Sequence, residues 1–126
     1  MRPRQAIALA GGFLLLAAAF AAGQKYPTVP YKEAGDHVDK VLWVRGTVLR
    51  AESAGEGTYL HFHNDKKYLS VLIPKEYLAN FKGSPGHLYA NKRIEAFGKV
   101  QRDGSKLMLA VDGPKKIRIL PPEKPT

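Results

Sequence analysis

The stretch VLWVRGTVLR (41–50) alternates between two kinds of side chain. The apolar or small set comprises Leu42, Val44, Gly46 and Val48. The mixed set comprises Trp43, Arg45, Thr47 and Leu49. A period of two with one apolar side is typical of a half-buried β-strand. Gly46 in the middle of this strand predicts a bend or bulge, as a tightly curved sheet requires.

Four further strands and one helix are predicted along the rest of the chain. The predicted strands are 58–63, 68–73, 92–100 and 106–111, and the last of them continues over 116–120. The predicted helix is 74–82. Loops are predicted over 51–57 and 83–91, and a turn over 64–67. Leu60 and Phe62 form the apolar side of the second strand. Pro74 suits the first position of the helix, and Gly83 suits its end. Gly98 predicts a second bend, this time in the fourth strand.

The element order, strand-strand-strand-helix-strand-strand, predicts the fold class. A small curved barrel closes its own edges and needs bends in its long strands. Gly46 and Gly98 supply such bends in the first and fourth strands. We therefore expect an all-β domain with one helix, a five-stranded OB-fold barrel. An open five-stranded sheet with one packed helix is the alternative, but it would not need these two glycines at corresponding places.

The N-terminal residues have the three-part layout of a secretory signal peptide. Arg2 and Arg4 precede an uncharged run over 6–22, and small residues close this run in a small-x-small pattern. An uncleaved membrane anchor is the alternative, although the run is short for a span and rich in Ala and Gly. The predicted organisation is a signal peptide over 1–23, a linker over 24–30, an OB-fold domain over 31–120 and a disordered tail over 121–126. We expect an exported protein, periplasmic or secreted, without stable membrane insertion after cleavage.

Charge and composition narrow the classes of partner. The chain has 126 residues, a net charge of +9 and no cysteine. Removal of 1–23 would take away two arginines and leave a charge of +7. This charge favours anionic partners such as nucleic acid, acidic lipid or cell-envelope polymers. The absence of cysteine excludes disulfides, thiol chemistry and a lipidated N-terminal cysteine.

Four segments carry a resemblance to a known family. They are EAGDHVDKVLWVRGTV (33–48), GTYLHFHND (57–65), NKRIEAFGKV (91–100) and DGPKKIRIL (112–120). Together they resemble small bacterial exported OB-fold domains of the tRNA-anticodon-binding-like superfamily, which open with a short helix and a Gly-Lys-x-Val-x-Val-x-Gly-x-Val strand. Asp39 and Asn91 stand where that pattern has glycine. The resemblance covers roughly 31–120. It implies an OB-fold and, by analogy of fold, nucleic-acid binding. It brings no catalytic set.

Aromatic and basic side chains on the outward strand faces predict a surface for single-stranded nucleic acid, because bases stack on rings and cations meet phosphates. The candidate residues are Trp43, Arg45, Tyr59, His61, His63, Lys66, Lys67, Phe97, Lys99, Arg102 and Lys106. Glu52 and Glu56 in the first loop oppose this interpretation, since they would repel phosphate. The hypothesis is an exported, non-enzymatic module that binds single-stranded nucleic acid or another polyanion. The alternative is a protein- or glycan-interaction module of the cell envelope that uses the same face.

The pair His61 and His63 is also a candidate metal site, because residues i and i+2 of a strand lie on one face about 7 Å apart. Zinc or copper needs a third and usually a fourth ligand, and no known ligand spacing supplies them. No metal or cofactor is therefore expected. Catalysis has no support from motifs either: the chain lacks cysteine, a Gly-x-Ser-x-Gly motif and an evident pair of catalytic carboxylates.

Overall fold

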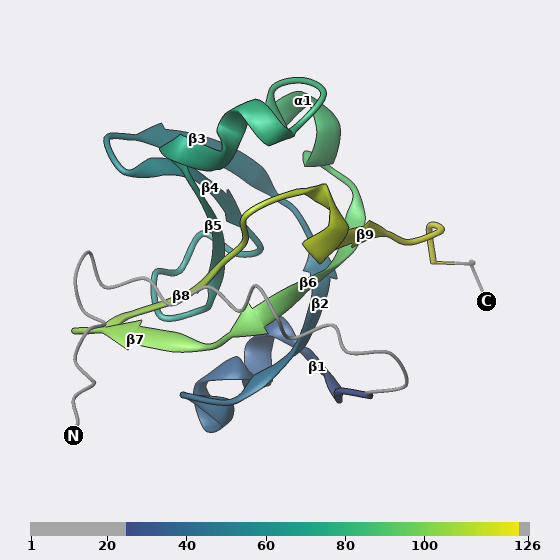
Figure 1. The fold of residues 1–126 in the computed structure, drawn as a ribbon. Helices are drawn as coiled ribbons and strands as arrows, with labels where there is room; N and C mark the ends of the chain where they lie inside the picture. Colours follow the sequence, from purple (N-terminus) through teal and green to yellow (C-terminus); the bar gives the residue numbers. More distant parts are fainter. Residues whose placement is uncertain (1–24, 124–126) are drawn as a thin grey trace.

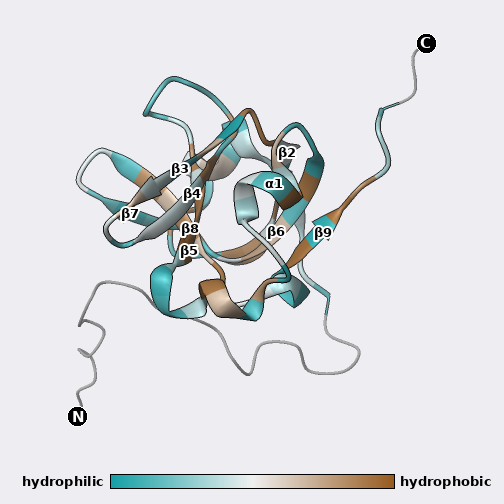
Figure 2. Ribbon diagram, turned by 90° about the horizontal axis from the view of Figure 1, so that it is seen from above, coloured by the Kyte–Doolittle hydropathy of each residue, from teal (hydrophilic) through white to brown (hydrophobic). Residues whose placement is uncertain are grey.

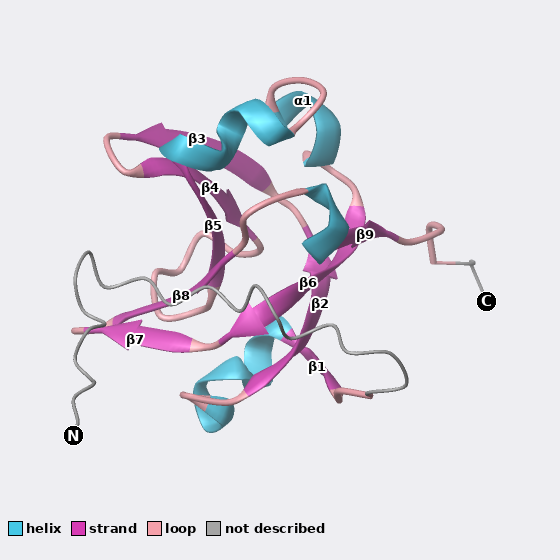
Figure 3. Cartoon of the chain, viewed as in Figure 1, coloured by secondary structure: helices cyan, strands magenta, loops and turns pink. Residues whose placement is uncertain are grey.

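The computed structural model describes residues 25–123, which form nine strands, one α-helix and three 3₁₀-helices (Figure 1, Figure 3). The predicted signal peptide (1–23) and the last three residues of the predicted tail (124–126) lie outside the described residues. Within 25–123, no helix is both long and apolar enough to cross a membrane.

The strands are arranged in two sheets. The four-stranded sheet has the order β1 (Thr28–Pro30), β2 (Val41–Thr47), β6 (Arg93–Lys99) and β9 (Ile117–Ile119). The five-stranded sheet has the order β3 (Arg50–Ala54), β4 (Gly57–His61), β5 (Ser70–Pro74), β8 (Lys106–Ala110) and β7 (Gln101–Asp103). The pairs β1–β2 and β5–β8 are parallel, and the other pairs are antiparallel.

Two chain segments each contribute to both sheets. β2 leads into β3 after Val48 and Leu49, and β6 leads into β7 after Val100. The predicted first and fourth strands are thus present, but each divides at a bend and continues further than predicted. The predicted loop over 51–57 is wrong where β3 lies. Four of the five residues of β3 are exposed at a sheet edge, and their sequence, RAESA, carries no apolar alternation that would indicate a strand.

The helical region differs from the prediction. The segment predicted as a helix over 74–82 forms only a 3₁₀-helix, η3 (Lys75–Asn80). The α-helix, α1 (Pro85–Tyr89), lies in the predicted loop. Ser84 caps it by accepting a hydrogen bond from the backbone N–H of His87, and Pro85 occupies a first-turn position. Viewed from above, α1 lies over the middle of the ring of strands (Figure 2), and it contacts β3 and β4.

Two more 3₁₀-helices complete the described chain: η2 (Tyr31–His37) before β2, and η4 (Pro114–Lys116) before β9. A strand, β9, is present within the predicted continuation over 116–120, but it is separate from β8 and belongs to the four-stranded sheet, where it pairs with β6. The single helix of the prediction is therefore replaced by one short α-helix and three 3₁₀-helices among the described residues.

One hydrophobic cluster fills the space between the sheets and confirms the predicted inward faces. The predicted inward residues Leu42, Val44, Val48, Leu60, Phe62, Ile94, Ala96 and Val100 are all buried in it. Gly46 faces the same cluster. A Cβ added at Gly46 would lie 2.6 Å from Phe62 Cδ1 and 2.8 Å from Tyr31 Cδ1, so the close approach at this bend requires glycine. The prediction of an all-β, OB-fold-like domain is confirmed, but the predicted closed five-stranded barrel is not: the nine strands of residues 25–123 form one four-stranded and one five-stranded sheet.

Candidate ligand-binding face

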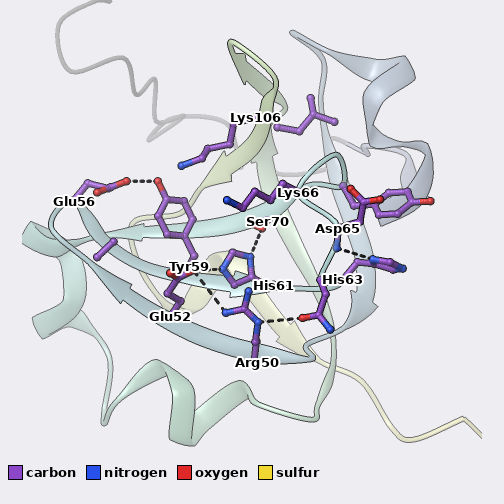
Figure 4. A pocket seen from close by; sticks show the side chains of 14 residues that line it. Arg50, Glu52, Glu56, Tyr59, His61, His63, Asp65, Lys66, Ser70 and Lys106 are labelled. Carbon is purple, nitrogen blue, oxygen red and sulfur yellow. Dashed lines mark hydrogen bonds and ion pairs between the residues drawn. The ribbon is translucent and has the colours of Figure 1, made fainter.

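A cleft of about 220 Å³ lies on the face of the five-stranded sheet that points away from the core (Figure 4). Its lining residues are Arg50, Glu52, Ala54, Glu56, Tyr59, His61, His63, Asn64, Asp65, Lys66, Tyr68, Ser70, Lys106 and Leu107. We call it the mixed cleft, because lysines, an arginine and three carboxylates line it together. Five residues predicted for the interface meet here: Tyr59, His61, His63, Lys66 and Lys106.

A chain of hydrogen bonds crosses three strands of this cleft. His61 on β4 is the cross-strand neighbour of Ser70 on β5 and of Arg50 on β3. His61 Nδ1 lies 2.7 Å from Ser70 Oγ, and His61 Nε2 lies 2.8 Å from Glu52 Oε1 (Figure 4). An ionised carboxylate only accepts hydrogen bonds, so Nε2 carries the proton. When the ring is neutral, Nδ1 accepts from the Ser70 hydroxyl, and when the ring is charged, both nitrogens donate.

The surroundings of Glu52 keep it ionised. The hydrogen bond and the charge of His61 lower the pKa of this carboxyl from its ordinary value, and Arg50 contributes in the same direction. Arg50 Nη1 lies 3.7 Å from Glu52 Oε1, and Arg50 Nε donates to Asn64 Oδ1 at 3.2 Å. The cleft therefore presents an oriented carboxylate beside cations rather than a purely basic surface.

Tyr59 does not offer the exposed ring that was predicted. Its side chain is buried in a small cluster with Leu72 and Met108. Its hydroxyl donates to the Glu56 carboxylate, and Lys106 Nζ lies 4.8 Å from the ring centroid. Burial raises the pKa of the Tyr59 hydroxyl, and the bond to Glu56 raises it further. This tyrosine stabilises the floor of the cleft and is not free to stack on a base.

A second cleft, of about 480 Å³, adjoins the first. Its lining residues are Tyr31, Lys32, Gly35, Lys67, Tyr68, Arg102, Ser105 and Leu107. We call it the basic cleft, because three cations and no carboxylate are among the described residues that line it. The predicted interface residues Lys67 and Arg102 lie here. Tyr68 and Leu107 line both clefts, which places the two clefts side by side.

Tyr68 lies at the junction of the clefts and was not predicted as a site residue. Its ring is half-buried and lies 4.6 Å from the His63 ring and 5.7 Å, edge-on, from the Tyr31 ring. Lys67 Nζ lies 5.2 Å from the centroid of Tyr68. Aromatic and cationic groups thus meet at this residue. The two lysines that precede Tyr68, Lys66 and Lys67, were the sequence feature that could have indicated it. The third strand is apolar on both faces, however, so the sequence did not show which way the Tyr68 side chain points.

The structure places other predicted site residues elsewhere. Trp43, Arg45, Phe97 and Lys99 belong to the four-stranded sheet, and none of them lines either cleft. Trp43 and Phe97 do not offer the exposed rings that the predicted interface requires, because they are 5% and 1% exposed.

Three contacts account for this burial. The two rings pack against each other at 5.1 Å, Tyr26 packs edge-on against Phe97 at 4.9 Å, and the Arg118 guanidinium lies 3.7 Å from the Trp43 centroid. Arg45 is engaged as well, since its Nε donates to the buried Glu95 carboxylate at 3.0 Å.

The two histidines of the predicted pair have separate surroundings. His61 bonds to Glu52 and Ser70, whereas His63 Nδ1 accepts from the backbone N–H of Asp65 at 3.0 Å. Across residues 25–123, no group of three or more His, Cys, Asp or Glu side chains is placed to hold a metal ion.

Comparisons with known proteins give structural likeness without sequence similarity. No family model matches the chain, and no curated protein matches it. An aspartyl tRNA synthetase from Entamoeba histolytica superposes with a TM-score of 0.54 at 16% identity, over 83% of this chain and 23% of that one. A putative aspartyl-tRNA synthetase from Leishmania major Friedlin gives 0.48 at 13% identity, over 79% and 22%. The hypothetical protein ygiW from E. coli gives 0.48 at 14% identity, over 77% and 99%.

These likenesses concern the fold alone. The chain spans less than a quarter of the length of the two synthetase chains. The superposition with the Entamoeba structure accords with the predicted OB-fold-like architecture.

Proposed function

We propose that this chain is a binding module for single-stranded nucleic acid or another polyanion, and that the ligand lies along the mixed and basic clefts across Tyr68. One observation carries the proposal: the basic cleft gathers Lys32, Lys67 and Arg102 around two tyrosines, with no carboxylate among its described lining residues. Cations that track a phosphate backbone, beside rings on which bases stack, are the two components of single-strand binding.

The position of the clefts supports this proposal. Ligands of OB-folds cross the second and third barrel strands between the first and last hairpin loops. Here these strands are β4 and β5, and the flanking hairpins are β3–β4 and β7–β8. A structural neighbour is named as a tRNA synthetase, and a nucleic-acid ligand accords with that name.

We also propose that the chain is exported, to the periplasm or the exterior, after removal of residues 1–23. The basic N-terminus and the apolar run that follows it support this. N-terminal mass mapping of the protein from fractionated cells tests it. A first residue near 24 in the envelope or secreted fraction is expected, and an intact N-terminus in the soluble cell interior would contradict it.

The alternative partner is a protein or glycan of the cell envelope. The three carboxylates of the mixed cleft, Glu52, Glu56 and Asp65, are the observation that favours it, because they oppose a phosphate placed there. The two proposals predict different effects of salt on affinity: binding through phosphates weakens steeply as the salt concentration rises, and binding to an uncharged glycan or protein surface does not.

Titration of the purified chain with a fluorescent single-stranded oligonucleotide at several salt concentrations tests the proposal. Three phosphate contacts predict a slope of log K against log salt of about −2. Lys67→Gln and Arg102→Gln should each weaken binding and reduce the slope by about 0.7. The control is Lys75→Gln, an exposed lysine on η3 that lines neither cleft. No binding at low salt, or equal binding by the control and the cleft variants, would refute the proposal.

A further inference from the structure

The two adjoining clefts differ in charge although they share a wall. Among the charged residues that line them, the basic cleft has cations only, whereas the mixed cleft has both carboxylates and cations. A phosphodiester strand that lies across both therefore experiences two environments. The basic cleft attracts its phosphates. In the mixed cleft, the three carboxylates offset the attraction that the cations there exert on a phosphate.

Glu52 has a free acceptor in the mixed cleft. Its oxygen Oε1 receives the contacts from His61 Nε2 and Arg50 Nη1. Its other oxygen, Oε2, has no hydrogen-bond or ion-pair partner in the part of the chain that the structure describes. The side chain is 53% exposed, and two neighbours hold it in one orientation. An oriented, ionised acceptor that solvent can reach is suited to an N–H or O–H donor on a ligand.

Nucleobases differ in the donors that they present to such an acceptor. Cytosine carries an exocyclic amino group at N4, which can donate a hydrogen bond to a carboxylate. Thymine has a carbonyl oxygen at the corresponding position. A carboxylate attracts the amino group and repels the carbonyl oxygen. Lys66 lines the same cleft and can donate to a base carbonyl elsewhere on the ring.

We propose that the mixed cleft holds a nucleobase with an exocyclic amino group, which donates to Glu52, while the flanking phosphates lie in the basic cleft. This inference rests on the proposed function. It assigns the phosphates to Lys32, Lys67 and Arg102, and it makes Glu52 the residue that determines base preference. Tyr68, which lines both clefts, lies where the strand passes from one to the other.

The test compares three fluorescent probes of equal length at slightly alkaline pH and low salt: an oligodeoxycytidine, an oligothymidine and an abasic phosphodiester. We expect the cytidine probe to bind several-fold more tightly than the thymidine probe, and the abasic probe to bind most weakly. Glu52→Gln supplies the second comparison. Its amide can donate to the thymine oxygen, so the ratio of cytidine to thymidine affinity should fall towards one.

The control is Glu76→Gln, which removes the same charge from an exposed position on η3 outside both clefts. A purely electrostatic role of Glu52 would strengthen binding of all three probes alike in Glu52→Gln and leave their ratios unchanged, which would overturn the inference. Equal affinity of the wild-type chain for all three probes would overturn it as well, while the salt dependence would still support polyanion binding. Absence of binding by every probe would remove the proposed function together with the inference.

Discussion

His61 Nε2 lies 2.8 Å from Glu52 Oε1, and this contact links β4 to the edge strand β3. With Ser70 on the other side of the ring, the three side chains follow the acid–base–hydroxyl order of a nucleophilic site. Such a site also needs preorganised donors for an oxyanion. Ser70 lies on a strand with ladder partners on both sides, which engage the backbone there. We therefore interpret the chain of bonds as a device that orients Glu52 and His61.

The contact predicts a lowered pKa for Glu52. His61 and Arg50 favour the ionised form of Glu52. The stability that these contacts add to the folded state is therefore complete above the ordinary glutamate pKa and is lost as the pH falls through the lowered value. His61→Ala should raise the pKa of Glu52 towards its ordinary value, and Arg50→Gln should do so to a smaller extent. Carbon-detected NMR titration of the Glu52 carboxyl measures both. An identical midpoint in the wild type and in His61→Ala would show that the contact is not formed in solution.

Tyr59 predicts an opposite dependence at alkaline pH. The pKa of Tyr59 is raised in the folded chain. The contribution of the neutral hydroxyl to folding stability is therefore complete below the ordinary tyrosine pKa and is lost as the pH rises above that ordinary value. Tyr59→Phe should keep the ring packed and reduce this alkaline loss. Tyr59→Ala should lower the free energy of unfolding by about 3 kcal/mol, because it empties a buried site between Leu72 and Met108. Urea unfolding at neutral and alkaline pH measures each variant. Equal stability of the two variants at neutral pH would contradict the burial of this ring.

Local alternation was sufficient to predict the inward faces of the strands. Leu42, Val44 and Val48 alternate in sequence because one face of β2 packs on the core, and the burial follows directly from the period. Gly46 was identifiable for the same reason, since a small residue at an inward position marks a close approach. These features depend on residues only a few positions apart.

The outward faces could not be predicted in the same way, because distant segments cover them. Arg118 of β9 lies over Trp43, and Tyr26 packs on Phe97, so these two predicted interface aromatics of the four-stranded sheet are buried. The basic cleft likewise assembles from separate elements: Lys32 comes from η2 and Arg102 from β7. The periodicity within one segment gives no information about the burial of Trp43 and Phe97 by distant segments, or about the assembly of the basic cleft from separate elements.

Trp43 is the only tryptophan of the chain and reports directly on this correction. Because it is 5% exposed and lines neither cleft, its fluorescence emission should be blue-shifted and weakly quenched by iodide. Saturating oligonucleotide should leave the emission unchanged. Trp43→Phe should retain binding, whereas Trp43→Ala should lose about 3 kcal/mol of stability or more. Strong quenching of the Trp43 fluorescence by the oligonucleotide would contradict this, because it would show that Trp43 contacts the ligand.

Gly57 at the start of β4 provides a test of the hairpin that carries Glu52 and Glu56. Its φ of +151° is rare for residues with a side chain, and an added Cβ would lie 2.1 Å from the backbone oxygen of Ile73. Gly57→Ala should therefore lower the free energy of unfolding by at least about 2 kcal/mol.

Gly55, in the turn of the same hairpin, is the matched control, because a Cβ there would meet no described atom within 4 Å. Gly55→Ala should change the stability by no more than about 0.5 kcal/mol. Urea unfolding of the two variants decides the matter. Since β4 lies between β3 and β5, strain at Gly57 should also disturb the mixed cleft, so Gly57→Ala should bind the oligonucleotide more weakly than Gly55→Ala under conditions where both are folded. Similar stability of the two variants would mean that β4 does not begin against Ile73 as described.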